Sequence, residues 1–566
     1  MPKLDKCLAV VAWVAAVAGS ACDLPTGVDG GSGGGGSIFD DPGEGKVAAE
    51  PADLAKSACG SVGVEGECTA DGKVRKCLEP TGYGEPKVVT YGCGKFASCT
   101  VSDGAASCTD QKGKCTPEDT RCTDATTLEY CDNDGAWQSV DCGSPCKSAA
   151  ISSFCDAGTG KDLYTVTVQY EAVGPNDSMT DWSTAAATVA AQGVLALAFD
   201  TAGEGTIIDS AIADSGGTVA LDLSGAKGDV TIAIVAARLG DDKNKLDYII
   251  AQPDVGDGKQ DTDLAAPKGA DAKPWSWQID PKKSPSGSTV VVKRSQGSGV
   301  LRVFDILRFA HAKANATLAG ATLPLVVWMR PNTTWDCGAC FNDWPTAVSS
   351  FDVLAQAWLP MDAKDQSYWA DPVTAHELGH WVMAAFSTSP NEGGSHCLGV
   401  PTFPGQAWSE GWATGFSSII RDNPLYYDKQ QGSFFWVDLA GQKYESGKFL
   451  VKPQAKLGLI QFEDENHVAS LLWHLAQNPA IGPTKTLFAV SSTRLQVEAG
   501  KRGYARRTWK MANCKASDAV NTGKAAPFLA DYLDALRCEG TAAAEVDAVT
   551  KPATQFPYPA DAPLCD

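Results

Sequence analysis

The spacing of the cysteines restricts how the first part of this chain can fold. Twelve of the 20 cysteines lie between residues 59 and 155, in two sets of six with matching intervals. Cys68 and Cys122 each precede the next cysteine by nine positions, and so do Cys99 and Cys146. The match indicates a duplicated unit of about fifty residues, which is too small to bury a sufficient core without disulfides. The two sets are Cys59, Cys68, Cys77, Cys93, Cys99 and Cys108, and Cys115, Cys122, Cys131, Cys142, Cys146 and Cys155.

These disulfide-rich repeats are predicted at residues 57–110 and 111–160, with three disulfides in each. Six cysteines allow fifteen pairings, so the connectivity stays open. A zinc-ribbon interpretation is disfavoured, because the spacings lack paired C-x-x-C motifs. The repeats could serve as a plain stalk or as a recognition module at the cell surface.

The N-terminus has the pattern of an export signal. An apolar run follows two lysines and is too short to span a bilayer, which predicts a signal peptide over residues 1–21. Cys22 follows Ser-Ala, as in a bacterial lipobox, and removal of Cys7 and Cys22 from the count leaves an even number of cysteines for disulfides. We therefore expect a lipid on Cys22 that anchors the protein to the membrane of the bacterial cell envelope, at the outer membrane or surface, through the Gly-rich tether of residues 22–56. A freely secreted protein is the alternative.

The next stretch, residues 161–296, reads as short apolar alternations separated by Gly and Asp clusters. Tyr164–Val168 and Thr231–Val235 are examples. This spacing predicts an all-β sandwich, and it contains no catalytic constellation. The acidic loop Asp254–Asp263 could hold a structural Ca²⁺, but it lacks the EF-hand spacing and a solvated loop is favoured.

The segment from His376 to His380 reads H-E-L-G-H and matches the motif H-E-x-x-H. On a helix, residues four apart lie on one face, so two neutral imidazoles can share one zinc ion. Glu377 between them can act as a general base toward water. Only six histidines occur in the chain, and two of them lie in this segment. An ordinary helix with two surface histidines is the alternative.

A third metal ligand is needed, because catalytic zinc has three protein ligands. Glu410 lies thirty residues after His380, on a segment where Trp408 and Trp412 recur at the spacing of an amphipathic helix. His396, in the Gly-rich loop between the two helices, is the rival third ligand.

The H-E-L-G-H segment followed by Ser-Glu-Gly-Trp-Ala resembles the gluzincin metallopeptidases, the group of thermolysin and aminopeptidase N. The resemblance implies an α+β, zincin-like catalytic domain at residues 297–566. It also implies one catalytic Zn²⁺ bound by His376, His380 and Glu410, with Glu377 as the general base. The 29 residues between His380 and Glu410 exceed the interval in those two subfamilies, which indicates an inserted loop and a distant branch. The resemblance covers these two helices and one later segment.

That later segment begins a predicted helix with acidic residues. Thermolysin-like enzymes carry at such a position a histidine that hydrogen-bonds the developing oxyanion, in an H-x-x-S context. His467, with Ser470 three residues on, matches it and is the predicted donor; a solvated histidine near a helix start is the alternative. His474, Tyr426 and Tyr427 remain further candidates.

The run Leu323–Met329 reads as a strand, and the resemblance suggests it as the sheet edge that pairs with extended substrate. Cys337 and Cys340 could form a redox pair, although no thioredoxin-like pattern surrounds them. Cys397 lies in the inserted loop, so a disulfide there would pin that loop. The six cysteines of this region suit three disulfides and are Cys337, Cys340, Cys397, Cys514, Cys538 and Cys565.

The length and the net charge of the chain limit its domain organisation and its partners. A length of 566 residues is too great for one core, and a net charge of −21 argues against nucleic acid as a partner. We therefore expect a zinc-dependent peptidase acting on protein or peptide substrates at the bacterial surface. The absence of a G-x-M-E-N segment favours endopeptidase action. A surface binding or adhesion protein with a structural zinc site, and a zinc amide hydrolase acting on cell-wall links, are the alternatives.

Overall fold

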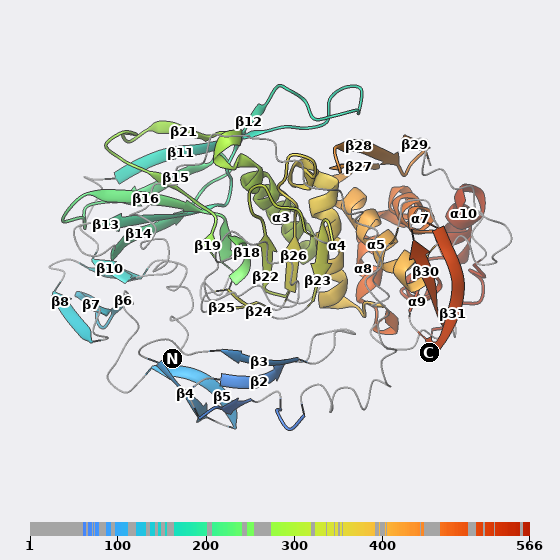
Figure 1. Ribbon diagram of the computed structural model, residues 1–566, viewed down its shortest axis with the longest axis horizontal. Coiled ribbons are helices and arrows are strands. Elements are labelled where there is room, and N and C mark those ends of the chain that lie inside the picture. The colour runs from blue at the N-terminus through green and yellow to red at the C-terminus, as the bar shows by residue number, and fades with distance from the viewer. Residues whose placement is uncertain are drawn as a thin grey trace.

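Figure 1 shows the computed structural model of the protein, a multidomain chain of mixed α/β structure with several β-sheets and a group of helices toward the C-terminus. It describes most residues between 60 and 565, so the predicted signal peptide and tether lie outside the described residues, as does the acidic loop considered for calcium. The longer stretches left out are 79–86, 92–96, 111–119, 132–135, 149–152, 156–162, 201–205, 240–245, 254–272, 319–322, 391–395, 397–401, 446–463 and 496–504, and gaps of one to three residues occur elsewhere.

The two cysteine-rich repeats have the same arrangement of strands. Each consists of a three-stranded antiparallel sheet and a separate two-stranded hairpin. The first repeat contains β1 (Glu67–Cys68), β2 (Val74–Leu78), β3 (Lys87–Tyr91), β4 (Ala97–Ser102) and β5 (Ala105–Asp110). The second contains β6 (Thr120–Cys122), β7 (Thr127–Cys131), β8 (Trp137–Asp141), β9 (Cys146–Ser148) and β10 (Ser153–Cys155). The shared arrangement supports the duplication that the cysteine spacing predicted.

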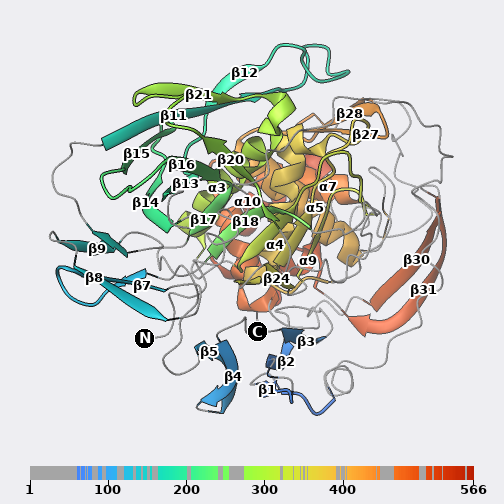
Figure 2. The same ribbon diagram turned by 60° about the vertical axis from the view of Figure 1, so that its left-hand side comes forward.

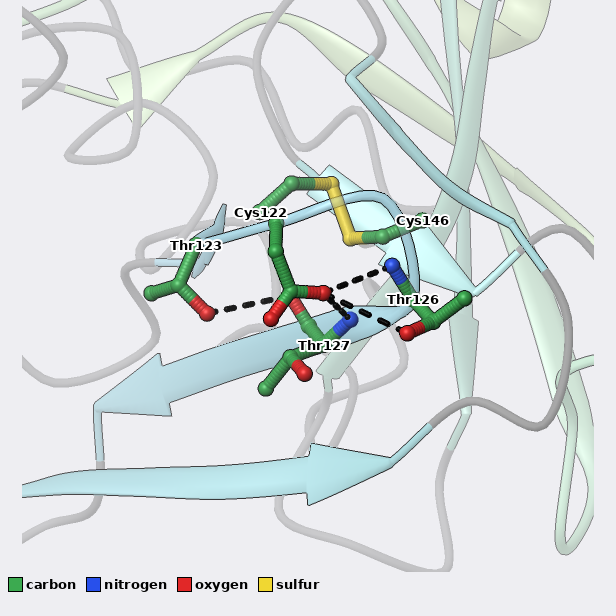
Figure 3. The surroundings of a disulfide bond; sticks show 6 residues. Cys122, Thr123, Thr126, Thr127 and Cys146 are labelled. Atoms are coloured by element: carbon green, nitrogen blue, oxygen red, sulfur yellow. Dashed lines mark hydrogen bonds between the residues drawn. A yellow bond between two sulfur atoms is a disulfide. The ribbon is translucent and has the colours of Figure 1, made fainter.

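Disulfides join equivalent positions in the two repeats. Cys68 bonds Cys99 and Cys122 bonds Cys146, which are the second and fifth cysteines of their sets. Figure 3 shows the second bond beside a turn in which Asp124 Oδ1 accepts hydrogen bonds from the backbone N–H groups of Thr126 and Thr127, each at 2.8 Å. Because small units bury little apolar surface, such cross-links supply much of their stability.

The predicted sandwich range supplies two sheets with a common core. One has the order β12-β11-β15, with β21 beside β11, and the other has the order β14-β13-β16-β20. Along β11 every second residue is buried, the alternation expected of a strand with one face on a core. The strands are β11 (Leu163–Ala172), β12 (Ala187–Ala190), β13 (Leu195–Asp200), β14 (Thr206–Ile212), β15 (Thr218–Asp222), β16 (Val230–Val235), β20 (Ser276–Ile279) and β21 (Ser288–Val292).

Three strands from the same stretch belong instead to a six-stranded sheet that extends into the C-terminal part. Its order is β17-β18-β22-β26-β23, with β19 beside β18. The boundary predicted at residue 296 therefore does not separate the sheets. The strands are β17 (Ala237–Leu239), β18 (Leu246–Gln252), β19 (Lys273–Pro274), β22 (Leu325–Trp328), β23 (Cys340–Asn342) and β26 (Ala355–Trp358).

The strand predicted at residues 323–329 is present as β22, but its expected role at the sheet edge is wrong. It lies between β18 and β26 and pairs with both in parallel, so neither of its edges is free. All four residues of β22 are buried, and an unbroken apolar run of this kind is typical of the interior of a parallel sheet. In the described part of the chain, β17 and β23 stand at the two ends of this sheet's order, and β23 pairs antiparallel with β26.

Helices pack beside this sheet and continue toward the C-terminus (Figures 1 and 2). The helix containing the H-E-x-x-H segment starts with Asp371-Pro372, and proline is common in the first turn because its missing N–H is not needed there. None of the helices in the described ranges is long and apolar enough to cross a membrane. The helices are α3 (Ser298–Thr317), α4 (Asp371–Phe386), α5 (Pro404–Arg421), α7 (Glu465–Gln477), α8 (Gly482–Phe488), α9 (Leu529–Cys538) and α10 (Ala543–Thr554). The other strands are β24 (Thr346–Val348), β25 (Phe351–Val353), β27 (Leu425–Gln430), β28 (Ser433–Asp438), β29 (Lys443–Glu445), β30 (Ala505–Ala512) and β31 (Lys515–Ala525).

Two further disulfides lie in this part. Cys337 bonds Cys340 in the turn that leads into β23, and Cys538 at the end of α9 bonds Cys565. Cys397 and Cys514 lie outside the described residues.

Three glycines allow α4, α5 and α7 to approach closely. A Cβ at Gly379 would lie 2.5 Å from Ala413 Cα, and one at Gly411 would lie 2.5 Å from Val468 Cβ. A Cβ at Gly415 would lie 2.8 Å from Leu472 Cδ1. The glycines of the H-E-L-G-H and E-G-W-A-T-G segments therefore set the spacing of the helices that carry the candidate site.

Substitution of Gly379 by alanine tests this close approach. Alanine favours an exposed helix over glycine by about 1 kcal/mol, but here its Cβ meets the backbone of α5, which cannot move without shifting the helix. We expect Gly379→Ala to lower the free energy of unfolding by about 1–3 kcal/mol in denaturant titration. Gly225→Ala, at a position with no atom within 4 Å of the added Cβ, is the control. Stabilisation by Gly379→Ala would contradict the packing described.

Candidate metal centre and active site

Two helices bring three ligand atoms together. His376 and His380 lie one turn apart on α4, and Glu410 faces them from α5. Glu410 Oε2 lies 3.1 Å from His376 Nε2 and 3.1 Å from His380 Nε2, and the two Nε2 atoms are 3.1 Å apart. Zinc–nitrogen bonds of about 2.0 Å in a tetrahedral site place ligand atoms about 3.3 Å apart, so these three side chains fit a zinc ion.

The remaining nitrogen of each histidine is held by the helix that carries Glu410. His376 Nδ1 lies 2.9 Å from Thr414 Oγ1, and His380 Nδ1 lies 3.3 Å from Ser409 Oγ. Such outer contacts fix the ring orientation and leave the Nε2 atoms directed at a common point, as in metal sites. One helix therefore supplies both a ligand and the supports of the other two.

Burial and charge set the protonation of the three ligands. Burial, opposed by Glu410, lowers the pKa of His376 to about 4, so its imidazole is neutral at pH 7. Burial also disfavours charge on His380 and on Glu410. The attraction between the two side chains outweighs this effect of burial and raises the pKa of His380. His396 and His380 together hold the pKa of Glu410 well below its usual value. A buried carboxylate that stays ionised beside imidazoles is a donor set suited to a divalent cation.

Glu377 lies next to this group and is buried. Its Oε2 atom is inaccessible and has no hydrogen-bond partner in the described part of the chain. Burial raises the pKa of Glu377 to about 8, while His380 opposes the shift. A carboxylate with a raised pKa is a stronger base than an ordinary glutamate, which suits proton transfer near neutral pH.

The predicted oxyanion donor has other contacts. His467 Nδ1 lies 3.2 Å from Oδ2 of Asp464, the N-cap residue of its own helix, and among the described residues no contact joins it to the three ligands. Glu465, two residues earlier, makes the contact from this helix toward the site, through His396. His474, in the last turn of α7, lies near Asp438 and Ala440.

The two tyrosines on β27 point in opposite directions, as neighbours on a strand do. The ring of Tyr426 lies 6.0 Å from that of His376, and burial followed by the charges of Asp428 and Glu377 raises its pKa well above the usual value. Tyr427 instead packs at 6.1 Å against Trp182 of the sandwich. Only Tyr426 of this pair lies beside the metal ligands.

Strand β23 borders the site. The ring of Phe341 stacks on that of His380 with centroids 6.1 Å apart, and β23 contacts α4. The disulfide between Cys337 and Cys340 closes the turn that precedes this strand. The sequence did not predict this strand, because Cys340–Asn342 is short and mixed in composition and shows no periodicity. The neighbouring C-x-x-C motif was the available signal in the sequence.

Asp428 on β27 allows a prediction of pH dependence. Its side chain is buried and accepts hydrogen bonds from Ser367 Oγ at 3.1 Å and Gln430 Nε2 at 2.8 Å. Burial raises its pKa to about 6, above the ordinary 3.8. The folded state therefore binds this proton more tightly than the unfolded state, so the ionised carboxylate costs stability above pH 6, and the cost disappears as the pH falls toward 4.

We expect Asp428→Asn to raise the melting temperature at pH 8 and to have little effect at pH 4, with a gain of at most about 3 kcal/mol at the higher pH. Asp547→Asn, which removes a more exposed carboxylate paired with Lys551, is the control and should lack this pattern. An equal effect of Asp428→Asn at both pH values would contradict the assignment.

Comparison with models of known protein families and with curated proteins finds no match to this chain.

Proposed function

We propose that the protein is a zinc-dependent peptidase of the gluzincin type that hydrolyses peptide bonds in protein or peptide substrates. The observation that carries the proposal is the convergence of His376 Nε2, His380 Nε2 and Glu410 Oε2 at 3.1 Å beside the buried Glu377. When bound there, zinc supplies a Lewis acid that polarises a carbonyl and favours ionisation of water. Three protein ligands are typical of catalytic zinc sites, whereas structural sites have four.

Glu377 is the proposed general base. It would accept a proton from the attacking water and then deliver that proton to the amine that leaves, so one carboxylate serves both steps. Its raised pKa and its lack of a hydrogen-bond partner in the described residues support this role. The lowered pKa values of His376 and Glu410 make these two ligands weak competitors for that proton.

Strand β23 is the proposed binding edge for extended substrate. It stands at one end of its sheet in the described part of the chain, it contacts α4, and the ring of Phe341 on it stacks on that of His380. A substrate strand that pairs with β23 would extend past the metal ligands on both sides, which favours an endopeptidase. A zincin-like arrangement of the domain is part of this proposal.

The cellular location is proposed from the sequence alone. A lipid on Cys22 and a Gly-rich tether would hold the enzyme at the bacterial cell surface, with the two disulfide-rich repeats between the membrane and the catalytic part. Disulfides in the described residues are consistent with an oxidising compartment.

The alternative function, a binding protein with a structural zinc site, requires a fourth protein ligand. In the described part of the chain the ligand atoms that lie within 4.8 Å of one another come from His376, His380 and Glu410. His396 Nε2 lies 3.6 Å from Glu410 Oε2 but does not belong to the group whose atoms all lie that close to one another. This favours a catalytic centre over a structural one.

Peptide digestion tests the proposal. The mature chain from Cys22 onward, loaded with zinc, should cut a mixture of peptides at internal bonds; a chelator should abolish the cuts and added zinc should restore them. Digestion of cell-wall fragments runs in parallel. Cleavage of the fragments without cleavage of peptides would support the amide hydrolase instead, and cleavage of neither would support the binding protein.

A further inference from the structure

A cavity of about 290 Å³ lies between helix α3, the start of α4, the end of α5 and strand β27. Asp371, the first residue of α4, Arg421, the last residue of α5, and Tyr427 on β27 line it. Tyr427 and Tyr426 are neighbours on this strand, so their side chains point to opposite faces, and the ring of Tyr426 lies beside that of His376. The cavity is therefore on the face of β27 that is turned away from the candidate metal centre.

The two carboxylates that line the cavity are already paired with protein donors. Asp371 Oδ1 accepts a hydrogen bond from Arg302 Nε at 2.6 Å, and its Oδ2 accepts one from Nη2 of the same guanidinium. Asp305 Oδ1 accepts a hydrogen bond from Arg308 Nη2 at 2.7 Å, and its Oδ2 accepts one from the hydroxyl of Tyr170 at 3.4 Å. Every oxygen of these two carboxylates thus has a donor from the protein.

The hydrogen-bond donors of the cavity, by contrast, are free. Tyr427 is only 7% exposed, yet its hydroxyl makes no hydrogen bond to any described residue. Arg421 donates from Nε to the carbonyl of Ser417 and from Nη2 to the carbonyl of Leu425, whereas its Nη1 atom has no partner in the described part of the chain. Asn423 Oδ1 accepts a hydrogen bond from the backbone N–H of Leu425 at 2.9 Å, which leaves its amide group as a third donor.

The charges around the cavity leave one guanidinium without a counter-ion. Arg302 pairs with Asp371 and Arg308 pairs with Asp305, but Arg421 makes no ion pair with a described residue. Burial of this uncompensated charge lowers the pKa of Arg421. Because a guanidinium removed from water is stabilised by an anion, the cavity suits a ligand with one negative charge.

We propose that this cavity is a binding site for a small organic carboxylate that carries an apolar group. One carboxylate oxygen would accept a hydrogen bond from Arg421 Nη1, and the other would accept from the hydroxyl of Tyr427 and the amide of Asn423. The apolar group would lie against Ile306 and Phe309, which complete the wall. A volume near the lower end of the range for ligand sites limits the ligand to a small molecule. This inference does not depend on the proposed peptidase function.

Calorimetric titration with phenylpropionate, a carboxylate with one aromatic ring, tests the site. Carboxylates also bind zinc, so the zinc-loaded mature chain and the same chain after chelation are titrated side by side. We expect one saturable site with a Kd of about 1 mM or lower that persists after chelation. The neutral phenylpropionamide has nearly the same shape and should bind at least about tenfold more weakly, because hydrogen bonds to charged groups are the stronger ones.

Two variants locate the bound carboxylate. Tyr427→Phe removes the free hydroxyl and keeps the ring that packs against Trp182, so phenylpropionate should bind about tenfold more weakly while the melting temperature stays nearly unchanged. Arg421→Gln should abolish detectable binding; it also removes hydrogen bonds at the end of α5, so its melting temperature is recorded. Tyr426→Phe makes the same chemical change on the opposite face of β27 and should leave binding to the chelated chain unaltered.

Several results would contradict the inference. Absence of saturable binding to the chelated chain would assign any binding by the zinc-loaded chain to the metal centre. Equal affinities for phenylpropionate and phenylpropionamide would show that the carboxylate is not recognised. An unchanged affinity in Tyr427→Phe would place the ligand elsewhere, and tighter binding of inorganic phosphate than of phenylpropionate, lost in the same variants, would make this a site for an inorganic anion.

Discussion

Replacement of Glu377 by glutamine should abolish most peptide cleavage while zinc stays bound. The glutamine keeps the size of the side chain and one acceptor oxygen, but it cannot take a proton at neutral pH. Loss of a general acid–base group typically costs 10²- to 10⁴-fold, and here one residue would serve both proton transfers, so we expect a fall in kcat of at least about a thousandfold. Since Glu377 is not among the ligand atoms, zinc content should remain at the level of the unchanged chain.

The melting temperature serves as the control for this variant. Glu377 is buried and its pKa is raised from 4.5 to about 8, so the fold loses stability as the pH rises through that range; a neutral glutamine should avoid this loss and should raise the melting temperature at pH 8 more than at pH 5. A variant that folds, binds zinc and cuts peptides at more than a tenth of the original rate would remove Glu377 from the mechanism.

Replacement of Glu410 by alanine should remove zinc at ordinary concentrations. The carboxylate is one of the three ligands and the only anionic one. Loss of a residue that only hydrogen-bonds a ligand typically lowers metal affinity by roughly 10- to 100-fold, so the loss of Glu410 should lower zinc affinity by more than that. Thr414→Val supplies that graded comparison, since it removes the hydrogen bond to His376 Nδ1 at 2.9 Å and leaves all three ligands. Competition with a chromogenic chelator measures both affinities.

Glu539→Ala, at an exposed glutamate, is the control and should bind zinc as the unchanged chain does. Unaltered zinc affinity in Glu410→Ala would show that another residue is the third ligand, with His396 as the first alternative. An affinity loss in Thr414→Val equal to that in Glu410→Ala would mean that the carboxylate contributes no more than an outer contact.

The sequence predicted the candidate site better than the fold around it. Positions 376 and 380 share a face on any α-helix, so their convergence follows from local geometry. Glu410 required only a second amphipathic helix and the glycines that let the two helices approach. The second and fifth cysteines of each repeat pair, a result that spacing alone could not select from fifteen pairings.

What the sequence could not predict depends on long-range pairing. Strands β17, β18 and β19 read like the rest of a sandwich, yet they belong to the sheet of β22, with which β18 pairs, because short alternating runs do not specify their partners. The edge position of β23 and the contact between His396 and Glu465 join segments far apart in the chain. For the contact between His396 and Glu465, the sequence shows only that Glu465 is an acidic residue at the start of a helix.

Anomalous diffraction at the zinc absorption edge would test the central claim most directly. Crystals of the zinc-loaded mature chain should give one peak per chain, within bonding distance of His376 Nε2, His380 Nε2 and Glu410 Oε2 and of no other protein atom. His396 should lie beside the ion without binding it. No peak at this position, or a peak that His396 completes as a fourth protein ligand, would contradict a catalytic zinc centre.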